Sequence, residues 1–183
     1  MVDLDAFAEE CKAALKADNT TKIVEDLVKQ VIADPEGLEK AFAQRKTGNS
    51  LVDSIVFNDD DLTIISIDTP PGLQSPAHNH NMWAVIGVYD GEENNRFFQD
   101  ADGDLRQTGE RNLKTGDVAV LNPKAIHAIN NPVPKVTKAI HVYGGNILNR
   151  PGRSIWHPDT LEREDYNIPN LTEYTAQLSR PVQ

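Results

Sequence analysis

The segment from residue 74 to residue 88 reads QSPAHNHNMWAVIGV and places two histidines directly before a nearly unbroken apolar run. That run, Trp83–Tyr89, ends at the turn-forming pair Asp90-Gly91. A short apolar run that stops at a turn signal is typical of a buried strand. His78 and His80 are two residues apart, so in an extended chain both side chains project from the same face. The segment therefore predicts a strand that presents two imidazoles on one surface.

On both sides of this segment the sequence alternates between apolar and polar residues, and turn signals recur roughly every 8 to 12 residues. Many short strands with regular turns and no helix between them favour a mainly β barrel or sandwich, drawn here as a jelly-roll-like barrel. The expected strands cover residues 51–58, 62–68, 83–89, 96–99, 105–113, 118–121, 126–129 and 136–143.

The first 45 residues show helical periodicity instead. Residues 3–17 carry apolar side chains at i, i+3, i+4 and i+7, with Asp3 as the expected N-cap. Thr20 or Thr21 is expected to cap a second helix, and a third helix is expected to begin at Pro35, a residue favoured in the first helical turn. The sequence thus predicts an N-terminal helical segment ahead of the strands.

Length and composition fit one soluble domain, because 39% of the 183 residues are apolar and 25% are charged. We expect residues 1–48 to form a helical segment packed on the barrel, and residues 49–183 to form the barrel with a C-terminal extension. The net charge of −10 disfavours nucleic acid as a partner. No apolar run is long enough to span a membrane, and residues 1–10 lack a signal-peptide pattern, so a cytoplasmic location is expected. A single cysteine, Cys11, excludes an intrachain disulfide and a Cys-rich zinc site.

Four of the five histidines fall within the predicted strands or next to them. His78 and His80 can both reach one metal ion, since imidazole nitrogens bind such ions at about 2.0–2.1 Å. His127 lies on a later predicted strand. The spacing predicts that His78 and His80 can share one metal ion.

The glycines around these histidines follow a known pattern. The first part reads Gly72-x5-His78-x-His80 with Gly91 closing a hairpin, and the second part runs from Gly116 to His127. This arrangement resembles the cupins. The resemblance implies a double-stranded β-helix with a metal site inside the barrel.

Two departures from the common cupin pattern make the resemblance more specific. Many cupins carry a glutamate ligand four or five residues after the second histidine, where this chain has Ala84 and Val85. Three neutral imidazoles leave the full charge on a divalent ion, which favours a soft anionic ligand such as a thiolate. The segment around the histidines is similar to that of the thiol dioxygenases, and above all the bacterial 3-mercaptopropionate dioxygenases, which also have a tryptophan and a Val-Ile-Gly-Val strand. Val85 occupies the position of a cysteine that cysteine dioxygenases link to a tyrosine, so no such link to Tyr143 can form.

A second motif, His141-x-Tyr143, matches the Ser-x-His-x-Tyr relay of these enzymes except that Ala139 replaces the serine. The resemblance implies one Fe(II) per chain bound by the three histidines. It also implies oxidation of a small thiol, 3-mercaptopropionate-like or cysteine-like, by O2 to its sulfinate. His141 and Tyr143 would be the catalytic residues, and the thiol and O2 the partners, with no role for nucleic acid or membrane.

The group that holds the substrate carboxylate is left open. Cysteine dioxygenase uses an arginine on an early strand, and the mercaptopropionate enzymes a glutamine nearby, whereas residues 51–68 contain neither. Asn49, Ser54, Arg96 and Arg153 are the candidates, and an aminothiol or a thiol with an uncharged tail is an alternative substrate. Two other functions also remain: a Zn-, Mn- or Ni-dependent cupin isomerase or hydrolase, and a non-catalytic cupin that binds a small ligand.

Overall fold

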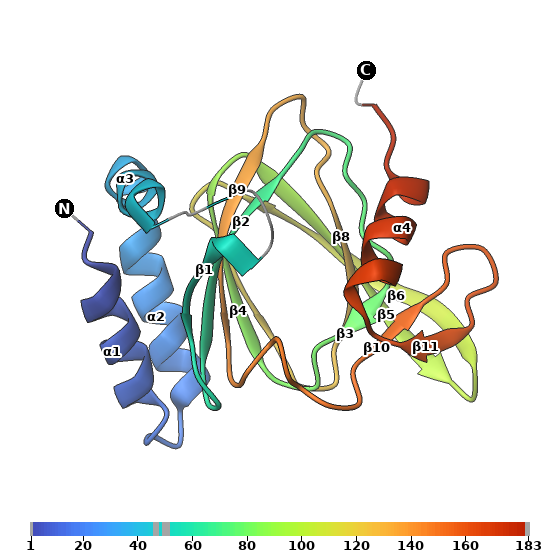
Figure 1. Cartoon of the computed structure of the whole chain (residues 1–183), viewed down its shortest axis with the longest axis horizontal. Coiled ribbons are helices and arrows are strands. Elements are labelled where there is room, and N and C mark those ends of the chain that lie inside the picture. The colour runs from blue at the N-terminus through green and yellow to red at the C-terminus, as the bar shows by residue number, and fades with distance from the viewer. Residues whose placement is uncertain (1, 46–47, 49–51, 182–183) are drawn as a thin grey trace.

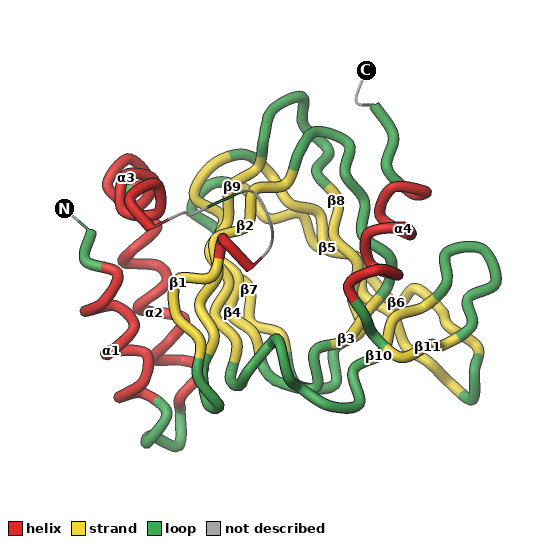
Figure 2. The backbone as a smooth tube through the Cα atoms, in the orientation of Figure 1, coloured by secondary structure: helices red, strands yellow, loops and turns green. Residues whose placement is uncertain are grey.

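Two antiparallel sheets face each other and form the body of the molecule (Figures 1 and 2). The computed structural model describes residues 2–45, 48 and 52–181. The first sheet has the order β1 (Ile55–Asn58), β2 (Thr63–Thr69), β9 (Thr137–Tyr143), β4 (Ala84–Asp90) and β7 (Val118–Leu121). The second has the order β11 (Arg163–Asp165), β10 (Ser154–Trp156), β3 (His78–Asn79), β8 (Ile126–Asn130), β5 (Glu92–Ala101) and β6 (Asp104–Lys114). This mainly β arrangement confirms the predicted fold class, a double-stranded β-helix.

Strand β9 shows how the first sheet is buried on both faces. It lies between β2 and β4, and its residue His141 is opposite Ile65 on one side and Ile86 on the other. Alternate residues of β9 belong to different apolar clusters: Ile140 packs toward the helices and Ala139 toward the barrel interior. Successive side chains of a strand point to opposite faces, so this alternation directs the odd-numbered residues of β9 into the barrel.

Three helices, α1 (Leu4–Ala14), α2 (Thr20–Ile32) and α3 (Pro35–Arg45), lie against the outer face of the first sheet (Figure 1). Asp3 caps α1 as predicted, since its Oδ1 accepts hydrogen bonds from the backbone of Asp5 and Ala6 at 3.0 Å each. The helix α2 comes close to β4 at Gly87, where a Cβ atom would lie 2.4 Å from Cγ1 of Val28. The glycine therefore permits the helices and the sheet to share one core.

Some predicted boundaries in this region were wrong. The first helix ends at Ala14, not at residue 17, and Asn19 occupies the N-cap position of α2. The hydroxyl of Thr20 donates instead to the carbonyls of Ala14 and Ala17, at 3.0 and 2.6 Å, and so closes the loop between the two helices.

The C-terminal extension has more structure than the sequence analysis predicted. It contains β10, β11 and the helix α4 (Ile168–Leu178), which lies beside the second sheet (Figure 1). Asn167 caps α4 by accepting from the backbone of Asn170 at 2.8 Å. Directly before β1, a short 3-10 helix, η1 (Val52–Ser54), replaces the first part of the strand expected over residues 51–58. None of the helices in the described part of the chain combines the length and the apolar character needed to cross a membrane.

Candidate metal centre

The three predicted ligands come together inside the barrel. His78 on β3 is paired directly with His127 on β8, and His80 follows one residue after the end of β3. Their ring centroids are 4.8 to 5.0 Å apart, and one ring nitrogen from each lies within 4.8 Å of the others. All three side chains are buried. This cluster could hold a metal ion.

The chain turns sharply after His80, the residue that directly follows β3. This turn fixes the position of the second imidazole. Asn81 adopts a φ of 55°, a left-handed conformation that asparagine tolerates better than most residues. Its side chain donates a hydrogen bond to the carbonyl of Gly152 at 2.6 Å. The loop before β10 therefore supports the backbone next to the second histidine.

Two of the three imidazoles are held in the tautomer that metal binding requires. Nδ1 of His78 lies 3.0 Å from the carbonyl of Pro76, and Nδ1 of His127 lies 2.9 Å from Oδ1 of Asn95. Both partners can only accept, so each Nδ1 carries the proton and each Nε2 presents a lone pair. Nε2 of His127 is buried and has no hydrogen-bond partner among the described residues. A buried nitrogen with a free lone pair, next to two further imidazoles, fits a divalent metal ion.

The protonation state of the three histidines also fits metal binding. Burial lowers the pKa of His78 to about 4. Burial, together with repulsion from the neighbouring histidines, holds the pKa of His80 and His127 well below the usual range. The three rings are therefore neutral at pH 7, the state in which imidazole binds metals.

The cluster opens onto a cavity of about 460 Å³, called here the histidine cavity. Its walls are largely apolar, with isoleucines from β2 and β8, and α4 contributes Leu171 and Thr175 on the side of the second sheet. The helix that the sequence analysis missed is therefore part of the wall of the site. A pocket of this size and character is suited to a small organic molecule.

His141 and Tyr143 line the same cavity as the three histidines. Nδ1 of His141 lies 2.9 Å from the hydroxyl of Tyr143, and the Tyr143 ring is 5.0 Å from the ring of His80. Both side chains are buried, and burial raises the pKa of Tyr143. The pair thus lies beside the metal ligands in a protonation state where the tyrosine hydroxyl keeps its proton.

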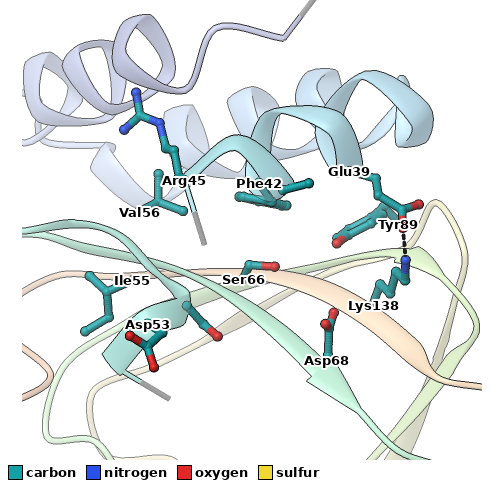
Figure 3. A pocket seen from close by; sticks show the side chains of 12 residues that line it. Glu39, Phe42, Arg45, Asp53, Ile55, Val56, Ser66, Asp68, Tyr89 and Lys138 are labelled. Carbon is teal, nitrogen blue, oxygen red and sulfur yellow. Dashed lines mark hydrogen bonds and ion pairs between the residues drawn. The ribbon is translucent and has the colours of Figure 1, made fainter. Parts of the chain in front are cut away.

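Of the four candidates for binding a carboxylate, the structure favours Arg153. Asn49 lies outside the described residues. Ser54 lines a different cavity of about 110 Å³ between α3 and the first sheet, shown in Figure 3. Arg96 lies on β5 and is not among the described residues that line the histidine cavity, whereas Arg153 is.

Arg153 is held firmly in place. Its Nε and Nη1 donate to the backbone carbonyls of Asn79 and Ile147, at 3.3 and 2.9 Å, and its guanidinium lies 3.6 Å from the ring centroid of Tyr166. These contacts fix a positive charge in the wall of the cavity. A guanidinium is well suited to pair with a carboxylate.

Sequence reasoning missed two buried residues behind the histidines, Glu93 and Asn95. Nδ2 of Asn95 donates to Oε1 of Glu93 at 2.8 Å, and Oε2 of Glu93 lies 3.8 Å from Nε2 of His141. Both residues belong to β5, which begins at Glu92, whereas the sequence analysis placed the start of this strand at Arg96. Glu93 and Asn95 are two residues apart, so in a strand their side chains lie on one face. This spacing is the sequence signal that could have identified the pair.

Comparisons with solved structures give low-identity likenesses, and no protein-family model matches the chain. An uncharacterized conserved protein with a double-stranded β-helix domain from Klebsiella pneumoniae is 20% identical, with a TM-score of 0.41, and the match covers 55% of this chain and 79% of that one. A recombinant oxalate oxidase in complex with glycolate is 19% identical, with a TM-score of 0.41 and coverage of 51% and 45%. An oxalate decarboxylase from Bacillus subtilis is 14% identical, with a TM-score of 0.41 and coverage of 48% and 22%. The chain spans less than half the length of either oxalate enzyme.

The two sheets and the histidine cluster define the class of protein. It has the cupin fold, a double-stranded β-helix, with a three-histidine site that could hold a metal ion.

Proposed function

We propose that the protein is an Fe(II)-dependent thiol dioxygenase that binds one metal ion per chain and oxidises a small thiol, 3-mercaptopropionate-like or cysteine-like, to its sulfinate. The observation that carries the proposal is the composition of the site: His78, His80 and His127, all neutral, face a cavity that also contains the fixed cation Arg153. The other partners would be O2 and the thiol alone.

The ligand set suits this chemistry. Three neutral imidazoles do not offset the charge of a divalent ion, so a thiolate becomes a favourable further ligand. Fe(II) held by His78, His80 and His127 would supply binding sites for the thiolate and O2, and the electron density that activates O2. The reaction balances without a further reductant: the O–O bond breaks, both oxygen atoms form bonds to sulfur, and sulfur loses the four electrons that O2 gains.

Three polar groups of the cavity have a part in this scheme. Arg153 binds the substrate carboxylate and so directs the thiol end toward the histidines. Tyr143 and His141 receive the thiol proton as the sulfur binds: the Tyr143 oxygen accepts it and passes its own proton to Nδ1 of His141, 2.9 Å away. The apolar walls exclude water from the reacting atoms.

Oxygen uptake by the purified protein tests this proposal. The protein is loaded with Fe(II) without air and is then offered 3-mercaptopropionate, cysteine and cysteamine separately. We expect one O2 to be consumed per thiol and a sulfinate to form. Both the oxygen uptake and the sulfinate should be lost in His127→Ala. If iron stays bound but no thiol is oxidised, the proposal is wrong. Loading with Zn(II), Mn(II) or Ni(II) then tests the alternative of another metal-dependent activity, since imidazole binds all of these ions.

A further inference from the structure

One buried carboxylate lies between the metal centre and the catalytic pair, outside the ligand set. Glu93 is 0% exposed, and among the described residues it is the buried carboxylic acid side chain. Its Oε1 accepts from Asn95, while its Oε2 has no hydrogen-bond partner among the described residues. Nε2 of His141, 3.8 Å away, is also buried and without a partner. Burying a carboxylate is costly, so its retention here needs a reason.

We propose that Glu93 is a positioning residue that fixes the tautomers of two histidines, the metal ligand His127 and the catalytic His141. The effect of the His141 tautomer on thiol oxidation rests on the proposed function, whereas the tautomers of both histidines do not depend on it.

The first branch runs through Asn95. A carboxylate oxygen can only accept, so the contact of 2.8 Å with Oε1 identifies the Asn95 atom there as the donor nitrogen Nδ2. The amide oxygen of Asn95 must then face His127, whose Nδ1 lies 2.9 Å away. That nitrogen has to donate, and Nε2 of His127 is left with the lone pair that a metal needs. Glu93 thus determines the tautomer of a metal ligand through one intermediate side chain.

The second branch runs directly to His141. The other carboxylate oxygen is also an acceptor, so the ring nitrogen that faces it, Nε2, carries the proton. A movement of about 1 Å brings the two atoms from 3.8 Å to hydrogen-bond distance. Nδ1 of His141 is then the acceptor for the Tyr143 hydroxyl, as the proposed proton path requires. Ala139, two residues earlier on the same face of β9, has only a methyl group and cannot accept a hydrogen bond from His141. Glu93 is therefore the residue that fixes the His141 tautomer.

The tautomers of His127 and His141 can be observed in the unmodified protein. Nitrogen-15 NMR of labelled histidines distinguishes protonated from unprotonated ring nitrogens, in the metal-free protein and in protein loaded with diamagnetic Zn(II). We expect the proton on Nε2 of His141 and on Nδ1 of His127. The opposite tautomer at His141 would overturn the proposal, and this measurement needs no variant that has to fold.

Two variants separate the branches. Glu93→Gln keeps an oxygen that can accept from Asn95 but places an amide donor toward His141. We therefore expect the His141 proton to move to Nδ1, with kcat for thiol oxidation reduced at least about tenfold and KM nearly unchanged. Asn95→Ala releases only the His127 branch, so we expect metal affinity, measured by competition with a chelator, to fall about 10- to 100-fold while the His141 tautomer stays the same.

Glu92→Gln is the matched control. Glu92 is the neighbouring carboxylate on β5, and it is partly exposed and bonded to Asn112 on the adjacent strand. This variant should leave the tautomers, metal affinity and kcat unchanged. A Glu93→Gln protein whose His141 tautomer equals that of the unmodified protein would refute the proposal. The NMR and chelator measurements do not depend on thiol oxidation, so a failure of the proposed function is seen separately, as missing oxygen uptake by the unmodified protein.

Discussion

Replacing Arg153 with glutamine should remove the preference for thiols that carry a carboxylate. In the structure the guanidinium uses Nε and Nη1 for the carbonyls of Asn79 and Ile147, and the rest of it lines the histidine cavity. Its charge acts on the site, since, after burial, it is one of the causes that lower the pKa of His78. Glutamine is shorter and neutral, so it can neither hold the carboxylate with a charge nor keep both backbone contacts.

The size of the effect follows from the interactions that are lost. A hydrogen bond to a charged group contributes about 1.5–3 kcal/mol, which corresponds to a decrease of about 10- to 150-fold in kcat/KM for 3-mercaptopropionate. Cysteamine has no carboxylate, so its kcat/KM should stay the same or rise. The variant also loses the contact between Arg153 and Tyr166, 3.6 Å from the guanidinium to the ring centroid. We expect a stability loss of about 2 kcal/mol, and a Tm lower by about 4–8 °C.

The assay is initial oxygen uptake by Fe(II)-loaded protein over a range of concentrations of each thiol. Arg163→Gln serves as the matched control, because Nε of Arg163 donates to Ser154 at 2.8 Å on the neighbouring strand but Arg163 does not line the histidine cavity. Equal losses for 3-mercaptopropionate and cysteamine in Arg153→Gln would refute the reasoning, since a general disturbance of the site affects both thiols. A lower kcat/KM for both thiols in Arg163→Gln would also refute the reasoning, because Arg163 does not line the histidine cavity.

Three further outcomes are expected. His127→Ala should bind far less than one iron per chain in equilibrium dialysis; full occupancy would contradict the assigned ligand set. In Gly87→Ala the new Cβ would lie 2.4 Å from Cγ1 of Val28, so urea unfolding should show a loss of about 1–3 kcal/mol, and an unchanged midpoint would count against this packing. Metal-free protein should lose stability as the pH falls from about 6.5 toward 4, because unfolded His78 takes up a proton that the buried ring, with a pKa of about 4, does not. His78→Asn should reduce the slope of unfolding free energy against pH by up to about 1.4 kcal/mol per unit, and equal slopes would disprove this linkage.

The parts of the site that the sequence predicted are those encoded by local spacing. His78 and His80 are two residues apart in an extended segment, and His141 and Tyr143 repeat that spacing on β9, so each pair shares a strand face whatever the rest of the fold does. The turn signals then separate the strands well enough to predict a barrel. His127 was predicted as the third ligand only through the resemblance to the cupin pattern, because its distance in sequence from the other two histidines carries no local signal.

The parts that the sequence analysis missed depend on contacts between distant segments. Glu93 and Asn95 occur in a polar run that looks like an exposed strand edge, and only the pairing of β5 with β8 brings them behind His127. Arg153 was one of four candidates from the sequence, and the sequence could not single it out, because it reaches the cavity from an irregular segment whose path no periodicity predicts. For α4 a local signal did exist, since Asn167 precedes a helix with proline in its first turn.

The balance of charge in the buried site favours a substrate with two negative groups. Among the described residues, Glu93 and Arg153 are the buried carboxylic acid and the buried guanidinium, and the opposite charges that such groups carry cancel. Asp68 also lines the histidine cavity but is exposed to solvent. A divalent ion on three neutral histidines therefore leaves two positive charges uncompensated in a largely apolar space, which is unfavourable. A mercaptocarboxylate, bound as thiolate and carboxylate, neutralises both, cysteine with its ammonium group neutralises one, and cysteamine neutralises none. On this ground we expect the order 3-mercaptopropionate, cysteine, cysteamine in kcat/KM, and a clear preference for cysteamine would mean that the charges of the site do not select the substrate.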